Sequence, residues 1–115
     1  MNTRLAGRTG EAKAAEYLRS KHYELLAAGY RCRFGEIDLI ARKKVLVVFV
    51  EVKLRRDSSF AAAYEAVTLE KQRKIITTAL YWAKAHKDER QMRFDVIEVY
   101  TDTGRINHIE NAFQA

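Results

Sequence analysis

The sequence predicts an α/β fold in which helices pack on a mixed central sheet, in the order α-β-β-β-α-β-β. Two segments, residues 7–24 and 69–87, repeat apolar side chains at helical spacing. Residues 36–41 alternate polar and apolar positions as a strand does, and residues 45–54 are the most β-branched stretch of the chain. One domain over residues 1–115 is expected, because this length can bury a core without disulfides or a structural metal.

The first helix is expected over residues 7–24. Turning each residue by 100° places Ala14, Ala15 and Leu18 on one apolar side. Glu11 lies in the middle of the same side, where a charged residue is not expected.

Three strands are expected next, at residues 30–34, 36–41 and 45–54. The polar turn at residues 42–44 is short enough to join the last two strands as an antiparallel hairpin. Residues 45–50 are apolar on both faces, which is typical of a strand in the centre of a sheet.

The second half of the chain is expected to add one long helix and two strands. A short helical turn at residues 60–66 precedes the helix at residues 69–87, for which Thr68 is the expected N-cap. Strands at residues 92–100 and 106–109 follow. The predicted buried stripe of the helix consists of Ile75, Ile76, Ala79, Leu80 and Ala83.

Composition and charge narrow the classes of protein that remain. One cysteine, Cys32, excludes a disulfide framework and a multi-cysteine zinc site, and it fits a reducing compartment. The longest apolar run, residues 45–50, is far too short to span a membrane, so a cytoplasmic location is expected. Lys and Arg outnumber Asp and Glu by 21 to 15, and the net charge of +6 favours an anionic partner, nucleic acid first.

Four charged residues interrupt the two strands of the predicted hairpin. Glu36 and Asp38 share one face of their strand, as do Glu51 and Lys53 on the next. A register that pairs Asp38 near Phe49 would place Glu36 near Glu51. Charges buried in a sheet cost several kcal/mol unless they are paired or bind a cation. Mg²⁺ or Mn²⁺ would relieve this cost, because a hard cation prefers carboxylate and water oxygens.

An alternative interpretation needs no metal. The same residues would then form an ordinary Glu–Lys pair on the solvent-facing side of a one-sided sheet. Glu11 favours the metal site, since a second, unconnected element also places a carboxylate on an inward face. Lys53 would lie close enough to position an attacking water or to stabilise charge in the transition state of phosphodiester hydrolysis.

Asp38 followed at a hairpin's distance by Glu51-x-Lys53 resembles the D…(D/E)xK core of the restriction-endonuclease-like superfamily, PD-(D/E)xK. Further motifs resemble, in the same order, those of the YraN-like family of bacterial proteins, usually described as predicted endonucleases. They are GRTGE at residues 7–11, GEIDLI at 35–40, FVEVK at 49–53, EAV at 65–67 and RFDV at 93–96. The resemblance spans about residues 4–100 and implies a restriction-endonuclease-like core similar to archaeal Holliday-junction resolvases.

The resemblance also implies roles for individual residues. Glu11, Asp38 and Glu51 would bind Mg²⁺ or Mn²⁺, and Lys53 would be the active-site lysine that completes the catalytic set. DNA is the expected substrate, and RNA stays open as an alternative because its hydrolysis would use the same chemistry. Fold analogy suggests branched or structured DNA. A departure, Ala61 where relatives often have glycine, affects only the loop after the active strand.

The resemblance further implies three polar candidates to support the metal ligands without binding metal: Glu36, Gln72 and Lys71. Gln72 is the one expected to point inward, because it lies three residues before Ile75 on the apolar stripe. Asp95, between Phe94 and Val96, is expected to make a structural pair.

The surplus of positive charge lies in residues 1–60, which hold 13 Lys or Arg against seven Asp or Glu; residues 61–115 hold eight of each.

Two other functions stay open: a non-catalytic nucleic-acid-binding module on a nuclease-like fold, and an accessory protein that binds a protein partner through Tyr81 and Trp82. A homodimer would suit cleavage of two strands. The candidates for nucleic-acid contact are Arg8, Arg31, Arg33, Arg42, Lys43, Lys44, Arg55 and Arg56.

Overall fold

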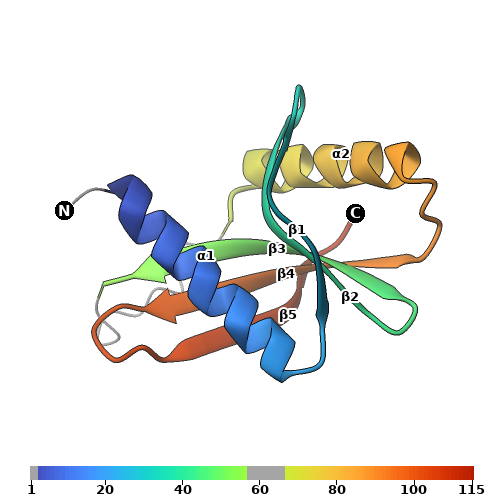
Figure 1. Cartoon of the computed structure of the whole chain (residues 1–115). Helices are drawn as coiled ribbons and strands as arrows, with labels where there is room; N and C mark the ends of the chain where they lie inside the picture. Colours follow the sequence, from blue (N-terminus) through green and yellow to red (C-terminus); the bar gives the residue numbers. More distant parts are fainter. Residues whose placement is uncertain (1–2, 57–66) are drawn as a thin grey trace.

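The computed structural model describes residues 3–56 and 67–115, with side chains from residue 9 onward. It is an α/β fold with one five-stranded sheet and two helices, in the predicted order α-β-β-β-α-β-β (Figure 1). The predicted helical turn at residues 60–66 lies outside the described residues. The elements are α1 (Thr3–Ser20), β1 (Glu24–Cys32), β2 (Gly35–Lys43), β3 (Leu46–Arg55), α2 (Leu69–Ala85), β4 (Gln91–Tyr100) and β5 (Ile106–Phe113).

The sheet is mixed, as expected, with its strands in the order β1-β2-β3-β4-β5. Neighbouring strands are antiparallel except β3 and β4, which run parallel. The parallel pair follows from the connection through α2, because parallel neighbours need a long crossover whereas antiparallel ones can join by a tight turn. β3 lies in the middle of the sheet, as its two apolar faces predict.

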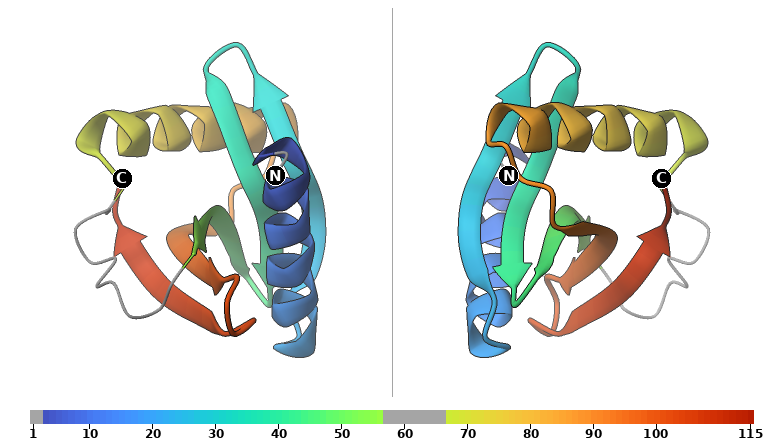
Figure 2. Two further views of the ribbon diagram at one scale, coloured as in Figure 1. Left: turned by 90° about the vertical axis from the view of Figure 1, so that its left-hand side faces the viewer. Right: turned by 90° about the vertical axis from the view of Figure 1, so that its right-hand side faces the viewer.

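The two helices pack on opposite faces of the sheet and generate two separate cores (Figure 2). On the α1 side, Ala14 and Leu18 pack against Leu39, Val48 and Val50. The next residues along the same strands point the other way, into the core under α2, because side chains of a strand alternate between faces. The central strands are therefore covered by a helix on both sides.

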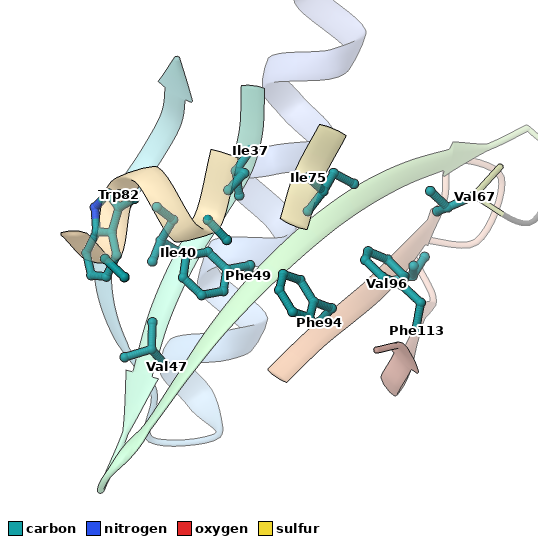
Figure 3. Close-up of a cluster of buried hydrophobic side chains, with 12 residues drawn as sticks. Ile37, Ile40, Val47, Phe49, Val67, Ile75, Trp82, Phe94, Val96 and Phe113 are labelled. Carbon is teal, nitrogen blue, oxygen red and sulfur yellow. The ribbon is translucent and has the colours of Figure 1, made fainter. Parts of the chain in front are cut away.

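The core under α2 is built around aromatic rings (Figure 3). Phe49 stacks on Phe94 with ring centroids 5.5 Å apart, and Trp82 meets Phe49 edge-on at 5.7 Å. Trp82 is only 4% exposed, whereas Leu80, predicted in the buried stripe, is 54% exposed.

The true buried stripe of α2 is Ile75, Thr78, Ala79, Trp82 and Ala83. The prediction for Leu80 is wrong because Thr78 can occupy an inward position: its hydroxyl donates a hydrogen bond to the carbonyl of Lys74 at 2.7 Å. With Thr78 inside, the stripe is rotated toward Trp82. A protein-binding surface made of both Tyr81 and Trp82 is therefore wrong, because the indole belongs to the core.

The first helix ends four residues earlier than predicted. His22 has a left-handed backbone (φ 70°), and the N–H of Tyr23 donates to the carbonyl of Leu18 at 3.0 Å. This capping geometry stops the helix and turns the chain into β1. Glu24, predicted as the last residue of the helix, and residues 25–29, for which no helix or strand was predicted, therefore belong to a nine-residue strand.

The β2–β3 hairpin has a tighter turn than predicted and a different register. Lys43 pairs with Leu46, and Lys44 in between has a positive φ of 57°. Ile40 consequently pairs with Phe49, so the predicted pairing of Asp38 near Phe49 is wrong by two residues. A shift of two leaves every side chain on its predicted face, because the side-chain period of a strand is two.

The last strand, β5, continues to Phe113 instead of ending at residue 109, and the ring of Phe113 stacks on Phe94. In the part of the chain that is described, no helix has the length and apolar character needed to cross a membrane.

Candidate metal centre

Asp38 lies at the point where β2 leaves β3. The last backbone pair between these strands is Leu39 with Val50, which places Asp38 beside Glu51. Beyond this pair, the N–H of Val52 on β3 donates a hydrogen bond to a side chain of β2: Asp38 Oδ2 accepts it at 2.8 Å. The divergence of two strands thus brings Asp38 and Glu51 together.

Glu51 is a buried carboxylate, only 8% exposed. Its nearest charged partner is Lys53, whose Nζ lies 3.8 Å from Oε1. Within the described chain the Glu51 carboxylate accepts no hydrogen bond. Burial first, and then the negative charge of Asp38, raise the pKa of Glu51 to about 7, although the nearby ammonium groups of Lys71 and Lys53 act to lower it.

The pKa of Asp38 is also raised, first by burial and then by the charge of Glu36. The hydrogen bond from Val52 and the charges of Lys71 and Lys53 act in the opposite direction. The same two lysines therefore act on both carboxylates, and so does Glu36, which raises the pKa of each.

Lys71 comes to the site from the first turn of α2. Thr68 caps this turn as predicted, accepting a hydrogen bond from the N–H of Lys71 at 3.1 Å. The Gln72 side chain instead donates to the carbonyl of Val67 at 2.9 Å and secures the start of the helix. The positive charge of Lys71 acts on both carboxylates.

Two other buried acids show what a structural carboxylate looks like in this protein. Asp95 accepts hydrogen bonds from His108 Nε2 at 2.6 Å, from Arg93 Nη2 at 2.7 Å and from the N–H of Asn111 at 3.0 Å. Burial raises its pKa, but these hydrogen bonds outweigh burial and hold the pKa below its usual value. The expectation that Asp95 is structural is confirmed by these partners.

Glu98 follows the same pattern as Asp95. It accepts hydrogen bonds from Asn107 Nδ2 at 2.7 Å and from Arg55 Nε at 2.9 Å, and its pKa is lowered despite burial. Glu51 is different, because it accepts no hydrogen bond in the described chain, and the ion pair with Lys53 at 3.8 Å does not prevent its pKa from rising. Ionisable groups left uncompensated in this way are concentrated at functional sites.

The network around Asp95 was not foreseen from the sequence. His108 uses its second ring nitrogen, Nδ1, to contact the Tyr17 hydroxyl at 3.0 Å, and Arg93 donates to the Tyr23 hydroxyl at 2.8 Å. These contacts tie α1 to β4 and β5. They join residues up to 91 positions apart, so no local spacing indicated them.

Glu11 lies on α1, and its side chain is partly exposed. The α1 residues that follow it pack into the core on one face of the sheet, whereas Glu51 alternates with Val50 and faces the other side. Among the described residues, no three Asp, Glu, His or Cys side chains form a group able to hold a metal ion. The assignment of Glu11 as a third ligand stays a prediction.

The predicted positive rim is only partly present. Arg55 is buried and pairs with Glu98, so its guanidinium is not part of a positively charged surface. Lys43 lies at the opposite end of β2 from Asp38, about 16 Å along the strand. Arg42 pairs there with Glu24. The strand order separates these residues from the carboxylates although they are close in sequence.

Other candidate cations lie near the end of the β2–β3 hairpin at which Asp38 and Glu51 are located. Arg31 is exposed and pairs with Glu36 at 3.0 Å, and Arg33 is exposed in the turn that follows β1. Arg56 is exposed just after β3. Lys44 does not belong to this group, because it lies in the turn after Lys43, at the other end of β2. The Arg8 side chain lies outside the described residues.

A sequence profile of the uncharacterised protein family UPF0102 matches residues 10–99, which include Asp38, Glu51 and Lys53. The chain belongs to this family. The resemblance to YraN-like proteins is thereby confirmed at the level of the family.

Relatives match over nearly their whole length. A UPF0102 protein of Caldicellulosiruptor saccharolyticus is 44% identical over 118 residues, covering 98% of this chain and all of that protein. A UPF0102 protein of Clostridioides difficile is 45% identical over 114 residues, with 98% of this chain and all of the relative covered. One from Caldanaerobacter subterraneus is 44% identical, with 98% of both chains covered.

Proposed function

We propose that this UPF0102 protein is a metal-dependent endonuclease that hydrolyses phosphodiester bonds of DNA. The observation that supports this proposal most is Glu51, a buried carboxylate with a pKa near 7, beside Asp38 and without a hydrogen-bond donor in the described chain. A purely structural acid would be expected to have the donors that surround Asp95.

A divalent cation fits this pair of carboxylates. It would offset both the desolvation of Glu51 and its repulsion by Asp38, and hard cations such as Mg²⁺ and Mn²⁺ prefer these oxygens. Mg²⁺ is commonly held by one or two carboxylates and keeps several waters, so two protein ligands are sufficient. Glu11 is proposed as a further contributor. When bound, the cation would supply positive charge to offset the charge that develops on the phosphodiester.

The remaining residues act around the carboxylates. Lys53 and Lys71 present ammonium groups on the same side as Asp38 and Glu51, where a phosphate would otherwise be repelled. Lys53, nearest to Glu51, is proposed to position the attacking water or stabilise the transition state. Glu36 and Gln72 would act indirectly, and Gln72 does so by securing the helix turn that presents Lys71.

The net charge of +6 supports DNA as the partner, and branched or structured DNA is proposed by fold analogy with resolvases. We also propose that the protein acts in the cytoplasm and that a homodimer would serve cleavage of both strands.

The direct test incubates the pure protein with Mg²⁺ or Mn²⁺ and a panel of linear, nicked, flapped and four-way DNAs. Glu51→Gln is the test variant, and Glu16→Gln is its matched control, since Glu16 is exposed on α1 and the charge change is the same. Wild type and Glu16→Gln are expected to cut equally, and Glu51→Gln at least about 100-fold more slowly.

Equal cleavage by Glu51→Gln would contradict the proposal. If none of the proteins cuts DNA and calorimetry detects no Mg²⁺ or Mn²⁺ binding, but salt-sensitive DNA binding persists, the non-catalytic binding module replaces the nuclease. Absence of both metal and DNA binding would favour an accessory protein that acts through a protein partner.

A further inference from the structure

The β1–β2 hairpin extends beyond the sheet and crosses α2 (Figures 1 and 2). The crossing is close at Gly35, which has a positive φ of 152°; a Cβ there would lie 3.0 Å from the Thr78 hydroxyl. Glycine thus allows the hairpin tip to rest on the helix. The turn residues at the tip are thereby held next to the outer side of α2.

Two aromatic rings meet at this crossing. Phe34, from the hairpin turn, contacts Tyr81 of α2 with ring centroids 5.5 Å apart and planes inclined by 62°. Phe34 is 38% exposed and Tyr81 is 42% exposed. In the described part of the chain they are the only exposed Phe, Tyr or Trp side chains, and they are in contact with each other.

The surroundings of the two rings are positively charged. The guanidinium carbon of Arg33 lies 4.8 Å from the centroid of Phe34, in cation–π geometry. The helix that provides Tyr81 has a single acidic residue, Glu70, against four basic ones. The basic residues of α2 are Lys71, Arg73, Lys74 and Lys84.

We propose that Phe34, Tyr81 and Arg33 form a stacking surface for unpaired bases of a nucleic-acid strand. Aromatic rings and guanidinium planes bind the faces of bases, and those faces are accessible only where bases are not enclosed in a duplex stack. The positive charge of α2 and Arg33 complements the phosphates of such a strand. A protein partner is less favoured, because the exposed rings are few and surrounded by cations.

The surface lies within reach of the carboxylate pair. Asp38 is four positions after Phe34, which corresponds to about 13 Å of extended chain. A stacked strand advances about 3.4 Å per nucleotide, so a base on the rings would be about four nucleotides from a phosphate at the site. This inference rests on the proposed function for its meaning: the nuclease would select DNA with a single-stranded segment next to the bond that it cuts.

Binding of a fluorescein-labelled 12-mer of thymidylate, measured by anisotropy in EDTA, tests the surface without requiring cleavage. Phe34→Ala and Tyr81→Ala are each expected to weaken binding about tenfold, which corresponds to about 1.4 kcal/mol, a typical stacking contribution of one ring. Binding of a blunt duplex of the same length is expected to change less than twofold.

Two further variants separate stacking from a structural role of the rings. Tyr81→Phe keeps the ring and its contact with Phe34, and it is expected to bind thymidylate as wild type does. Leu80→Ala is the control, since Leu80 is exposed next to Tyr81 but has no aromatic ring. Wild-type binding by the Phe34→Ala/Tyr81→Ala double variant, or an equal loss for thymidylate and duplex, would overturn the inference.

The test is independent of catalysis because no divalent metal is present. Ring-dependent binding by a protein that never cuts DNA would refute the proposed cleavage and leave the stacking surface intact. Conversely, Glu51-dependent cutting with ring-independent binding would refute the stacking surface alone.

Discussion

Replacing Glu51 by Gln is expected to make the protein more stable above pH 7. Because burial raises the pKa of Glu51 from 4.5 to about 7, the folded state disfavours its charged form. The resulting loss of stability is absent below about pH 4.5, grows between pH 4.5 and 7, and is complete above pH 7. At 1.36 kcal/mol per pK unit it amounts to about 3 kcal/mol, which the neutral amide of Gln avoids.

Urea unfolding of metal-free protein in EDTA, followed by circular dichroism at pH 4.5 and pH 8.5, measures this effect. Glu51→Gln should exceed wild type by about 3 kcal/mol at pH 8.5, and the two should nearly coincide at pH 4.5. A variant that is less stable than wild type at pH 8.5, or a difference that does not depend on pH, would refute the assignment of Glu51 as an uncompensated charge.

Glu98→Gln is the control, and its effect should have the opposite sign. The pKa of Glu98 is lowered, so its charge stabilises the fold above its unfolded-state pKa, and that stability is lost as pH falls through the folded pKa. The change removes the carboxylate that contacts Arg55 at 2.9 Å and should cost about 3 kcal/mol at pH 8.5. The pair of variants therefore separates a functional buried acid from a structural one in a single assay.

Mn²⁺ should raise the melting temperature of wild type at pH 8 but hardly at pH 5, because a ligating Glu51 must be deprotonated; differential scanning fluorimetry with and without the ion measures this. Lys53→Met should lower the cleavage rate about 100-fold without changing the melting temperature by more than a few degrees, as judged by single-turnover assays. Trp82→Ala should destabilise the fold by about 3–5 kcal/mol in urea unfolding, since the indole fills the core under α2. His108→Ala should cost about 1–3 kcal/mol in the same assay, because it removes a hydrogen bond to the fully buried Asp95.

The order of the elements was predictable because each has its own hydrophobic period. The alternation in residues 36–41 and the apolar run in residues 45–50 are local patterns, and the structure has strands there. The end of the first helix was not predictable in the same way. It depends on a left-handed residue at His22, and a helical or extended assignment of Leu25 to Ala28 is equally compatible with local composition.

The central residues of the candidate site were predictable from the sequence, but the residues around them were not. Glu51 and Lys53 are charged residues in an otherwise apolar strand, and this pattern is visible in the sequence alone. The role of Lys71 depends on how the first turn of α2 faces the sheet. The position of Glu11 likewise depends on which face α1 covers, and Arg55 was assigned to a surface rim because its partner, Glu98, lies 43 positions away.

The sequence by itself determined the fold class, the family and the face on which each strand charge lies, because these depend on periodicity and on residues adjacent in the chain. Tertiary structure decided which charges are compensated. Asp95 finds hydrogen-bond donors on its own strand and on the neighbouring β5, and Glu98 finds them on its two neighbouring strands, β3 and β5. Glu51 lies where β2 separates from β3 and accepts no hydrogen bond in the described chain. A carboxylate's neighbours across a sheet come from strand order, and strand order results from packing of the whole chain rather than from any local segment.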